Sequence, residues 1–86
     1  AKDGDAFVRR LAIDGLRDWK QASVVDTLLA ALGDDDENVR DTAWSSLKLL
    51  TGQKLPFDAA GSKDARAKAA QRWQDWWDKN KATFGS

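Results

Sequence analysis

The stretch DDDENVRDTAWSSL, residues 34–47, decides the fold because the chain contains a second version of it. Residues 3–16, which lie 31 positions earlier, read DGDAFVRRLAIDGL. A period of about 30 residues on a helix–turn–helix unit is the signature of an α-solenoid, in which repeated helix pairs stack side by side. The identical pairs are Asp3/Asp34, Asp5/Asp36, Val8/Val39, Arg9/Arg40, Ala12/Ala43 and Leu16/Leu47.

Apolar spacing predicts four helices and no strand, and therefore an all-α fold. The predicted helices cover residues 5–18, 22–32, 37–51 and 63–82. In the first of them Val8, Ala12 and Leu16 recur at helical spacing. Gly33 and Gly52 follow the second and third helices, where a left-handed residue commonly ends a helix. The last helix is predicted to begin after an N-cap at Ser62 and to extend to about residue 82.

The pattern D-x-D-x-x-V-R-x-x-A-x-x-x-L, preceded by LLAALG, resembles a HEAT repeat, particularly the short bacterial kind of phycobilisome-lyase-like proteins. By this resemblance, residues 22–32 are an A helix and residues 37–51 its B helix. Residues 5–18 are the B helix of a preceding repeat. The segment LTG, a loop and RWQDWW are similar to the closing segment of bacterial HEAT-like proteins.

The resemblance implies one domain over residues 1–86, the C-terminal end of an α-solenoid fragment. Its repeat units are expected at about residues 3–33 and 34–62, with a Trp-rich capping helix at about 63–82. The implied function is a non-catalytic protein–protein interaction or scaffolding module within a larger protein. The chain has no Met, which predicts a processed product or an excised fragment, and the closing Gly85-Ser86 is interpreted as a cloning scar.

Arg9 and Arg40 fall inside the apolar arcs of their helices. An unpaired guanidinium there costs several kcal/mol, so each needs a partner. We expect the carboxylate six residues earlier to pair with each arginine, Asp3 with Arg9 and Asp34 with Arg40. HEAT proteins use such a structural Asp–Arg ladder, and the resemblance favours it. The alternative is that these arginines contact an anion or a partner.

Trp73, Trp76 and Trp77 fall in one arc of the last helix. Their i, i+3, i+4 spacing is typical of a stripe that faces the core. We expect them to form a capping core over the last repeat. Stacking of a sugar or a nucleobase is the alternative interpretation.

Composition excludes several classes of function. There is no Cys and no His, which excludes disulfides, zinc fingers and histidine acid–base chemistry. Fourteen basic and fourteen acidic residues cancel, which argues against a dedicated nucleic-acid binder and a polybasic membrane anchor. The acidic turn at residues 34–38 opens like a calcium loop, but Val39 and Ser45 stand where that loop needs Gly and Glu. We expect no catalytic residue, cofactor or metal.

Two surfaces remain as candidates for binding. The first helix lacks a preceding A helix, so Phe7 and Leu11 are expected to be exposed and to mediate self-association or contact with a partner segment. Lys68, Arg72 and Lys79 form a basic stripe on the last helix, which we interpret as a solvated face. The alternative function, a nucleic-acid-contacting HEAT-like module, would use that stripe and bind a duplex in a salt-dependent way.

Overall fold

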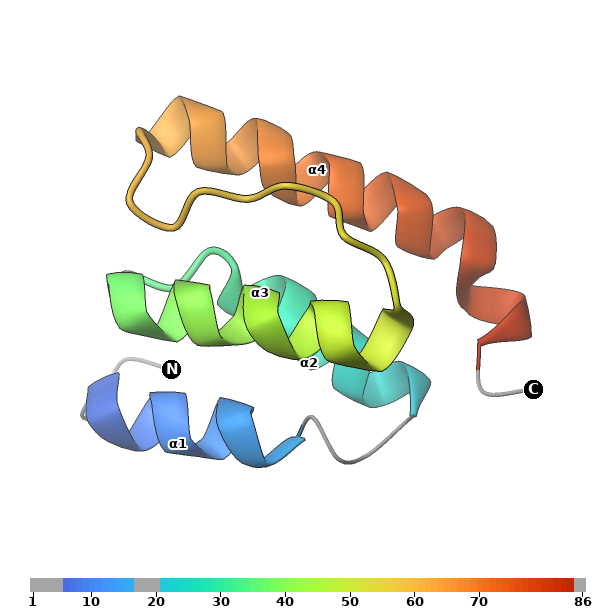
Figure 1. Cartoon of the computed structure of the whole chain (residues 1–86), viewed down its shortest axis with the longest axis horizontal. Coiled ribbons are helices and arrows are strands. Elements are labelled where there is room, and N and C mark those ends of the chain that lie inside the picture. Colours follow the sequence, from blue (N-terminus) through green and yellow to red (C-terminus); the bar gives the residue numbers. More distant parts are fainter. Residues whose placement is uncertain (1–5, 17–20, 85–86) are drawn as a thin grey trace.

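The computed structural model describes residues 6–16 and 21–84, apart from the side chains of residues 6, 7 and 9. It contains α1 (Ala6–Leu16), α2 (Ala22–Ala31), α3 (Glu37–Thr51) and α4 (Lys63–Asn80), followed by a 3₁₀ turn, η1 (Lys81–Thr83) (Figure 1). The described residues form no strand, so the all-α prediction is confirmed. Among those same residues, no helix is long and apolar enough to cross a membrane.

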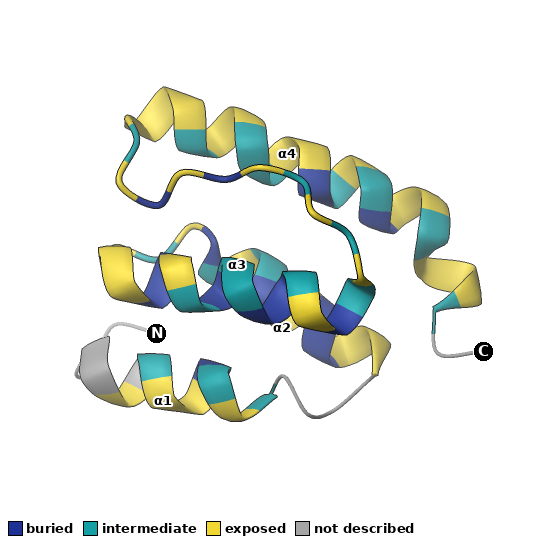
Figure 2. Cartoon of the chain, in the orientation of Figure 1, coloured by how far each residue is buried: buried dark blue, intermediate teal, exposed yellow. Residues whose placement is uncertain are grey.

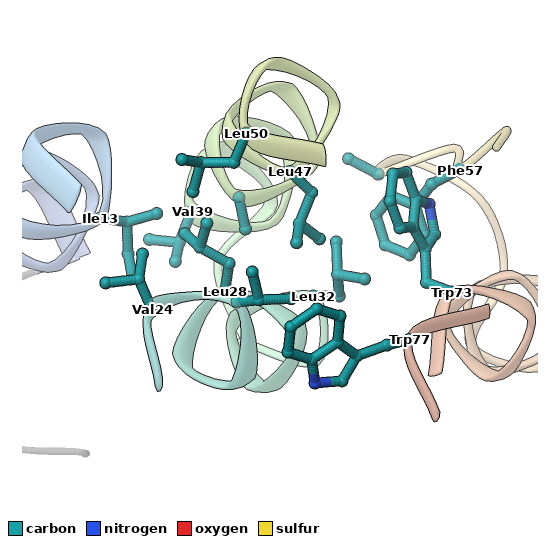
Figure 3. Close-up of a cluster of buried hydrophobic side chains, with 13 residues drawn as sticks. Ile13, Val24, Leu28, Leu32, Val39, Leu47, Leu50, Phe57, Trp73 and Trp77 are labelled. Carbon is teal, nitrogen blue, oxygen red and sulfur yellow. The ribbon is translucent and has the colours of Figure 1, made fainter. Parts of the chain in front are cut away.

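The helices are arranged in two layers. α1 and α3 lie side by side and run in the same direction, while α2 lies behind α3 and runs against it (Figure 1). α4 runs beside α2 and is joined to α3 by an extended segment of the chain (Figures 1 and 3). α3 is the central helix, since it packs on both α1 and α2. The pair α2–α3 is therefore one antiparallel hairpin. α1 corresponds to α3, the second helix of that hairpin, and not to the hairpin as a whole.

The sequence at the helix starts explains where α3 and α4 begin. The Asp36 carboxylate accepts hydrogen bonds from the backbone N–H groups of Asn38 and Val39, at 2.9 and 3.1 Å. The Ser62 hydroxyl accepts one from the N–H of Ala65 at 3.1 Å. Each cap satisfies N–H groups that have no partner inside their own helix. Ser62 is thus the N-cap that the sequence predicts.

The two helix-ending glycines behave differently. Gly52 adopts the left-handed conformation, with φ at 75°, and its N–H bonds to the carbonyl of Lys48. Gly33 does not, and its predicted left-handed role is wrong. There the chain leaves α2 through successive i to i−3 turns, in which the N–H of Gly33 bonds to Ala30 and that of Asp34 to Ala31. Right-handed turns of this kind need no glycine.

One apolar core joins all four helices (Figure 3). In the close-up, Ile13 of α1 and Val24 of α2 approach Val39 of α3, and on the far side Trp73 and Trp77 of α4 close the core. The buried apolar residues are Ile13, Val24, Val25, Leu28, Leu32, Val39, Ala43, Leu47, Leu50, Phe57, Ala59, Trp73 and Trp77.

The segment between α3 and α4 contributes to this core although it is not helical. We call residues 53–61 the strap. Leu55, Phe57 and Ala59 turn inward, while the residues between them are exposed. Period-two alternation is what an extended chain shows when one side is covered. The strap therefore runs along α3 as an extended segment that lies between α3 and α4 (Figure 2).

Candidate protein-interaction face

Arg40 is buried, with 7% of its surface exposed, and it holds the strap to α3. Its Nε and Nη2 donate to the carbonyl oxygen of Ala59 at 3.1 and 2.8 Å. Its Nη1 donates to the carbonyl oxygen of Asp34 at 2.7 Å. Hydrogen bonds from a charged donor are stronger than neutral ones. One guanidinium thus fixes both the turn before α3 and the end of the strap.

The sequence predicts the carboxylate of Asp34 as the partner of Arg40, and the structure shows main-chain oxygens of Asp34 and Ala59 as hydrogen-bond acceptors of this guanidinium. The main-chain oxygen of Asp34 accepts from the guanidinium, whereas its carboxylate Oδ1 accepts from the N–H of Asp36 at 2.8 Å. A short turn places the Asp34 side chain over this N–H group just before α3. Arg40 therefore connects the turn before α3 to the strap in this geometry.

Trp44 repeats the anchoring one helical turn later. Its indole Nε1 donates to the carbonyl oxygen of Leu55 at 2.8 Å. The ammonium of Lys48, one further turn along, lies 3.6 Å from the centroid of the Trp44 ring, which is a cation–π contact. This face of α3 is therefore occupied by the strap and by its own side chains.

The tryptophans of α4 divide into two kinds. Trp73 and Trp77 are completely buried, and Trp76 is half-buried. The indole Nε1 of Trp77 donates to the Asp26 carboxylate of α2 at 2.7 Å, and Phe84 packs edge-to-face on the same ring at 5.2 Å. α4 is thereby tied to α2 through its inner face. Buried rings of this kind leave no open stacking platform at Trp73 and Trp77.

The basic stripe of α4 lies in solvent. Lys68, Arg72 and Lys79 are all exposed. Acidic side chains lie on the same helix, where the carboxylates of Asp75 and Asp78 accept hydrogen bonds from Gln71 and Gln74 at 2.9 and 3.0 Å. Mixed charge along an exposed helix is typical of a solvated face.

Among the described residues the large exposed apolar side chains are Val8, Leu11 and, at 66%, Leu49 of α3, and the first two share one side of α1. Val8 is 57% exposed and Leu11 is 52% exposed. Ala12 and Gly15 are also exposed, and the four positions follow the i, i+3, i+4, i+7 spacing of a single helix face. We call these four residues the α1 stripe. In Figure 2 the exposed side of α1 points away from α3.

This placement changes part of the sequence interpretation. Val8 and Ala12 were predicted to share an apolar stripe with Leu16, but α1 instead buries Ile13 and half-buries Leu16. Exposure of Leu11 agrees with the expected open face. The side chains of Phe7 and Arg9, and the whole of Asp3, lie outside the described residues.

The described residues offer no constellation for chemistry. They contain no group of three or more Asp or Glu side chains that could hold a metal ion. Ser46 and Trp73 each bury a polar atom that has no hydrogen-bond partner within the described structure, but they lie on helix faces that belong to the core. The α1 stripe is thus the candidate site that the geometry leaves.

α2 and α3 form an antiparallel pair, and α1 repeats the sequence of α3 at a fixed period. This arrangement defines a helical-repeat protein of the α-solenoid class. The family model of HEAT repeats matches residues 1–82, and the chain belongs to that family. HEAT repeats are commonly protein-interaction scaffolds and are generally not catalytic. No curated protein and no solved structure shows significant similarity to the chain.

Sequence reasoning missed the strap and its anchors. The alternation of Leu55, Phe57 and Ala59 with exposed residues was a usable signal, since a loop without tertiary contacts does not show it. The carbonyl of Ala59 as the partner of Arg40 had no such signal. A main-chain acceptor can be supplied by any residue type, so only the three-dimensional arrangement identifies it.

Proposed function

We propose that this chain is a non-catalytic protein-interaction module and that the α1 stripe is its binding face. α2 and α3 form one repeat in this proposal, α1 is the second helix of the repeat before it, and α4 is a cap. The observation that carries the proposal is the exposure of Val8 and Leu11 on one helix face. Contiguous apolar surface of this kind marks a contact site in soluble proteins.

The rest of the surface supports this choice by contrast. The opposite end is closed, because Trp73 and Trp77 are buried under α4 and the strap covers α3. α4 presents mixed charges to solvent. A scaffold that is capped at one end and apolar at the other can make further contacts with a partner at its apolar end.

A site-specific photo-crosslinker tests the proposal in cells that make the protein. Placed at Leu11, it is expected to give a defined adduct with a polypeptide, either another copy or a different protein. Placed at Ala67, which is exposed on α4, it is the matched control and is expected to give none. The Leu11 adduct should disappear when Val8→Lys is added. The absence of any adduct at Leu11, or an equal yield at Ala67, contradicts the proposal.

A further inference from the structure

We infer that the bond between Asp14 and Gly15 is a site of spontaneous aspartate isomerisation, and that the reaction proceeds when α1 opens locally. The inference concerns the chemistry of α1 and does not rest on the proposed function. Its consequence falls on the α1 stripe, because Gly15 is one of the four stripe residues.

The reaction uses only groups of this residue pair and water. The main-chain nitrogen of Gly15 attacks Cγ of the protonated Asp14 carboxyl group, an N–Cγ bond forms, and one water molecule leaves. Water then opens the resulting five-membered succinimide ring at either of its carbonyl carbons. Opening at the main-chain carbonyl leaves the chain running through the Asp14 side chain, as isoaspartate, and no oxidant or reductant is needed.

The structure leaves this pair accessible. Among the described aspartates Asp14 is the one followed by glycine, and every other is followed by a residue whose side chain stands beside the attacking nitrogen. Gly15 is exposed, and within the described structure no atom outside its neighbours and its own helix backbone lies within 4 Å of the place where a Cβ would stand. Asp14 is half-buried, so solvent water reaches the pair.

The intact helix protects the bond. A helical residue has ψ of about −42°, which holds the Asp14 carboxyl carbon away from the nitrogen of Gly15. Ring closure needs a more extended backbone at Asp14. The N–H groups inside a helix are also held in its hydrogen-bond ladder. Isomerisation therefore requires α1 to open around residues 14 and 15.

Local opening of α1 is expected for two reasons. Among the described side chains of α1 only Ile13 is buried, whereas six residues of α3 are buried. Glycine inside a helix also weakens it, because glycine loses more conformational freedom on folding than alanine does. Segments with few buried contacts open at a lower free energy than the whole domain unfolds. The Asp14–Gly15 pair therefore lies in a helix that opens by itself.

Isomerisation changes the α1 stripe directly. It adds one methylene group to the main chain between Asp14 and Gly15, so that the residues before and after the bond no longer keep helical spacing. Gly15 follows Leu11 and Ala12 by four and three positions and loses its alignment with them. α1 thus carries a site at which a slow, non-enzymatic modification alters its exposed face.

Incubation of the full chain in oxygen-18 water tests the inference, since each molecule that passes through the ring keeps one heavy oxygen. Trypsin, applied afterwards in ordinary water, separates residues 11–17 from residues 3–9, which contain the other Asp-Gly pair of the sequence. Fragment ions then distinguish isoaspartate from aspartate at Asp14. A synthetic peptide of residues 11–17 gives the rate without α1, because so short a helix is not stable in isolation. We expect the folded chain to react at least about tenfold more slowly than the peptide, but measurably.

Two matched glycine substitutions show which part of the chain must open. Ala12 is exposed on α1 and Ala67 is exposed on α4. Ala12→Gly is expected to raise the rate at Asp14 about fivefold, the equivalent of about 1 kcal/mol of helix stability. Ala67→Gly should leave that rate unchanged, because α4 does not have to open. Asp14→Glu should abolish the label in residues 11–17, since its longer side chain cannot close the five-membered ring.

Three results would overturn the inference. One is a rate in the folded chain equal to that of the peptide, which would mean that α1 does not protect the bond. Another is no increase in label at Asp14 with Ala12→Gly. The third is an equal increase with Ala12→Gly and Ala67→Gly, since the reaction would then require unfolding of the whole chain.

Discussion

α1 and α3 carry the same sequence pattern and have different surroundings. Val39 lies in the core with 1% of its surface exposed, whereas Val8, the matching residue of α1, is 57% exposed. Ile13 in α1 is nonetheless buried, as its side of the helix faces α3 (Figure 3). The comparison teaches that a repeat encodes two packing faces for each helix and that its neighbours decide how many are used.

The different surroundings of α1 and α3 affect stability, because each buried helix face removes apolar surface from water. Full burial of a valine side chain stabilises a fold by about 1.5–3 kcal/mol relative to leaving it exposed. α3 obtains this order of stabilisation at Val39 and Leu47, and among the described side chains of α1 only Ile13 is buried. Among the described side chains, α1 therefore buries the fewest of the four helices.

The largest expected effect separates Val39→Lys from Val8→Lys. A charge placed at Val39 would be buried without a partner, which costs several kcal/mol out of a total stability of about 5–15 kcal/mol. The same charge at Val8 is expected to change stability by less than about 0.5 kcal/mol. Urea unfolding followed by circular dichroism measures both. Similar losses for the two variants would mean that the stripe is covered within the chain.

Arg40→Leu is expected to come next. It leaves the carbonyls of Ala59 and Asp34 without their charged donor, at a combined cost of about 3 kcal/mol. Asp34→Ala keeps the carbonyl and loses the side-chain bond to the N–H of Asp36, which is worth about 1 kcal/mol. Chemical denaturation of both variants checks the ranking. If Asp34→Ala is the more damaging, the carboxylate and not the main chain supports the arginine.

Trp44→Phe tests the face of α3 that holds the strap. The ring is largely kept, but the hydrogen bond from Nε1 to the carbonyl of Leu55 is lost, and we expect a destabilisation of about 1–2 kcal/mol. Faster amide hydrogen exchange in residues 53–61 should accompany it, because the strap loses an anchor. Unchanged exchange in the strap would show that Trp44 contributes by packing alone.

The smallest expected effect compares two glycines. Gly52→Ala forces a side chain into the left-handed conformation at φ 75° and should cost about 1 kcal/mol. At Gly33 the backbone is right-handed, and an added Cβ meets Ala30 O at an ordinary 3.6 Å. Gly33→Ala should therefore be neutral or stabilise by a few tenths of a kcal/mol. Equal losses at both sites, read from melting temperatures, would contradict this difference.

Much of this fold is predictable from the sequence because its signals are local. Helix spacing places α2 at Ala22–Ala31 and α3 at Glu37–Thr51, close to the expected bounds. Ser62 and Gly52 act as the cap and the stop that their residue types favour. Gly33 has the same residue type as Gly52 but not the same conformation, because a 3₁₀ exit from α2 satisfies its backbone in another way.

The site depends on information that the local pattern lacks. A helical-wheel projection identifies Val8 and Ala12 as apolar positions of a helix. It does not show whether another helix covers that face or whether the face is exposed to solvent. Their exposure is decided by whether another helix lies against α1. The carbonyl of Ala59 as an acceptor of Arg40 was not predicted for a similar reason, since Ala59 approaches the guanidinium only after the strap has folded back along α3.

The most direct test of this account is the solvent accessibility of two valine side chains. A soluble paramagnetic agent relaxes methyl groups in proportion to their exposure, and methyl-labelled protein allows Val8 and Val39 to be compared in one sample. We expect strong relaxation at Val8 and almost none at Val39. A Val8 signal that is as protected as that of Val39 would contradict the claim that α1 carries an exposed apolar face.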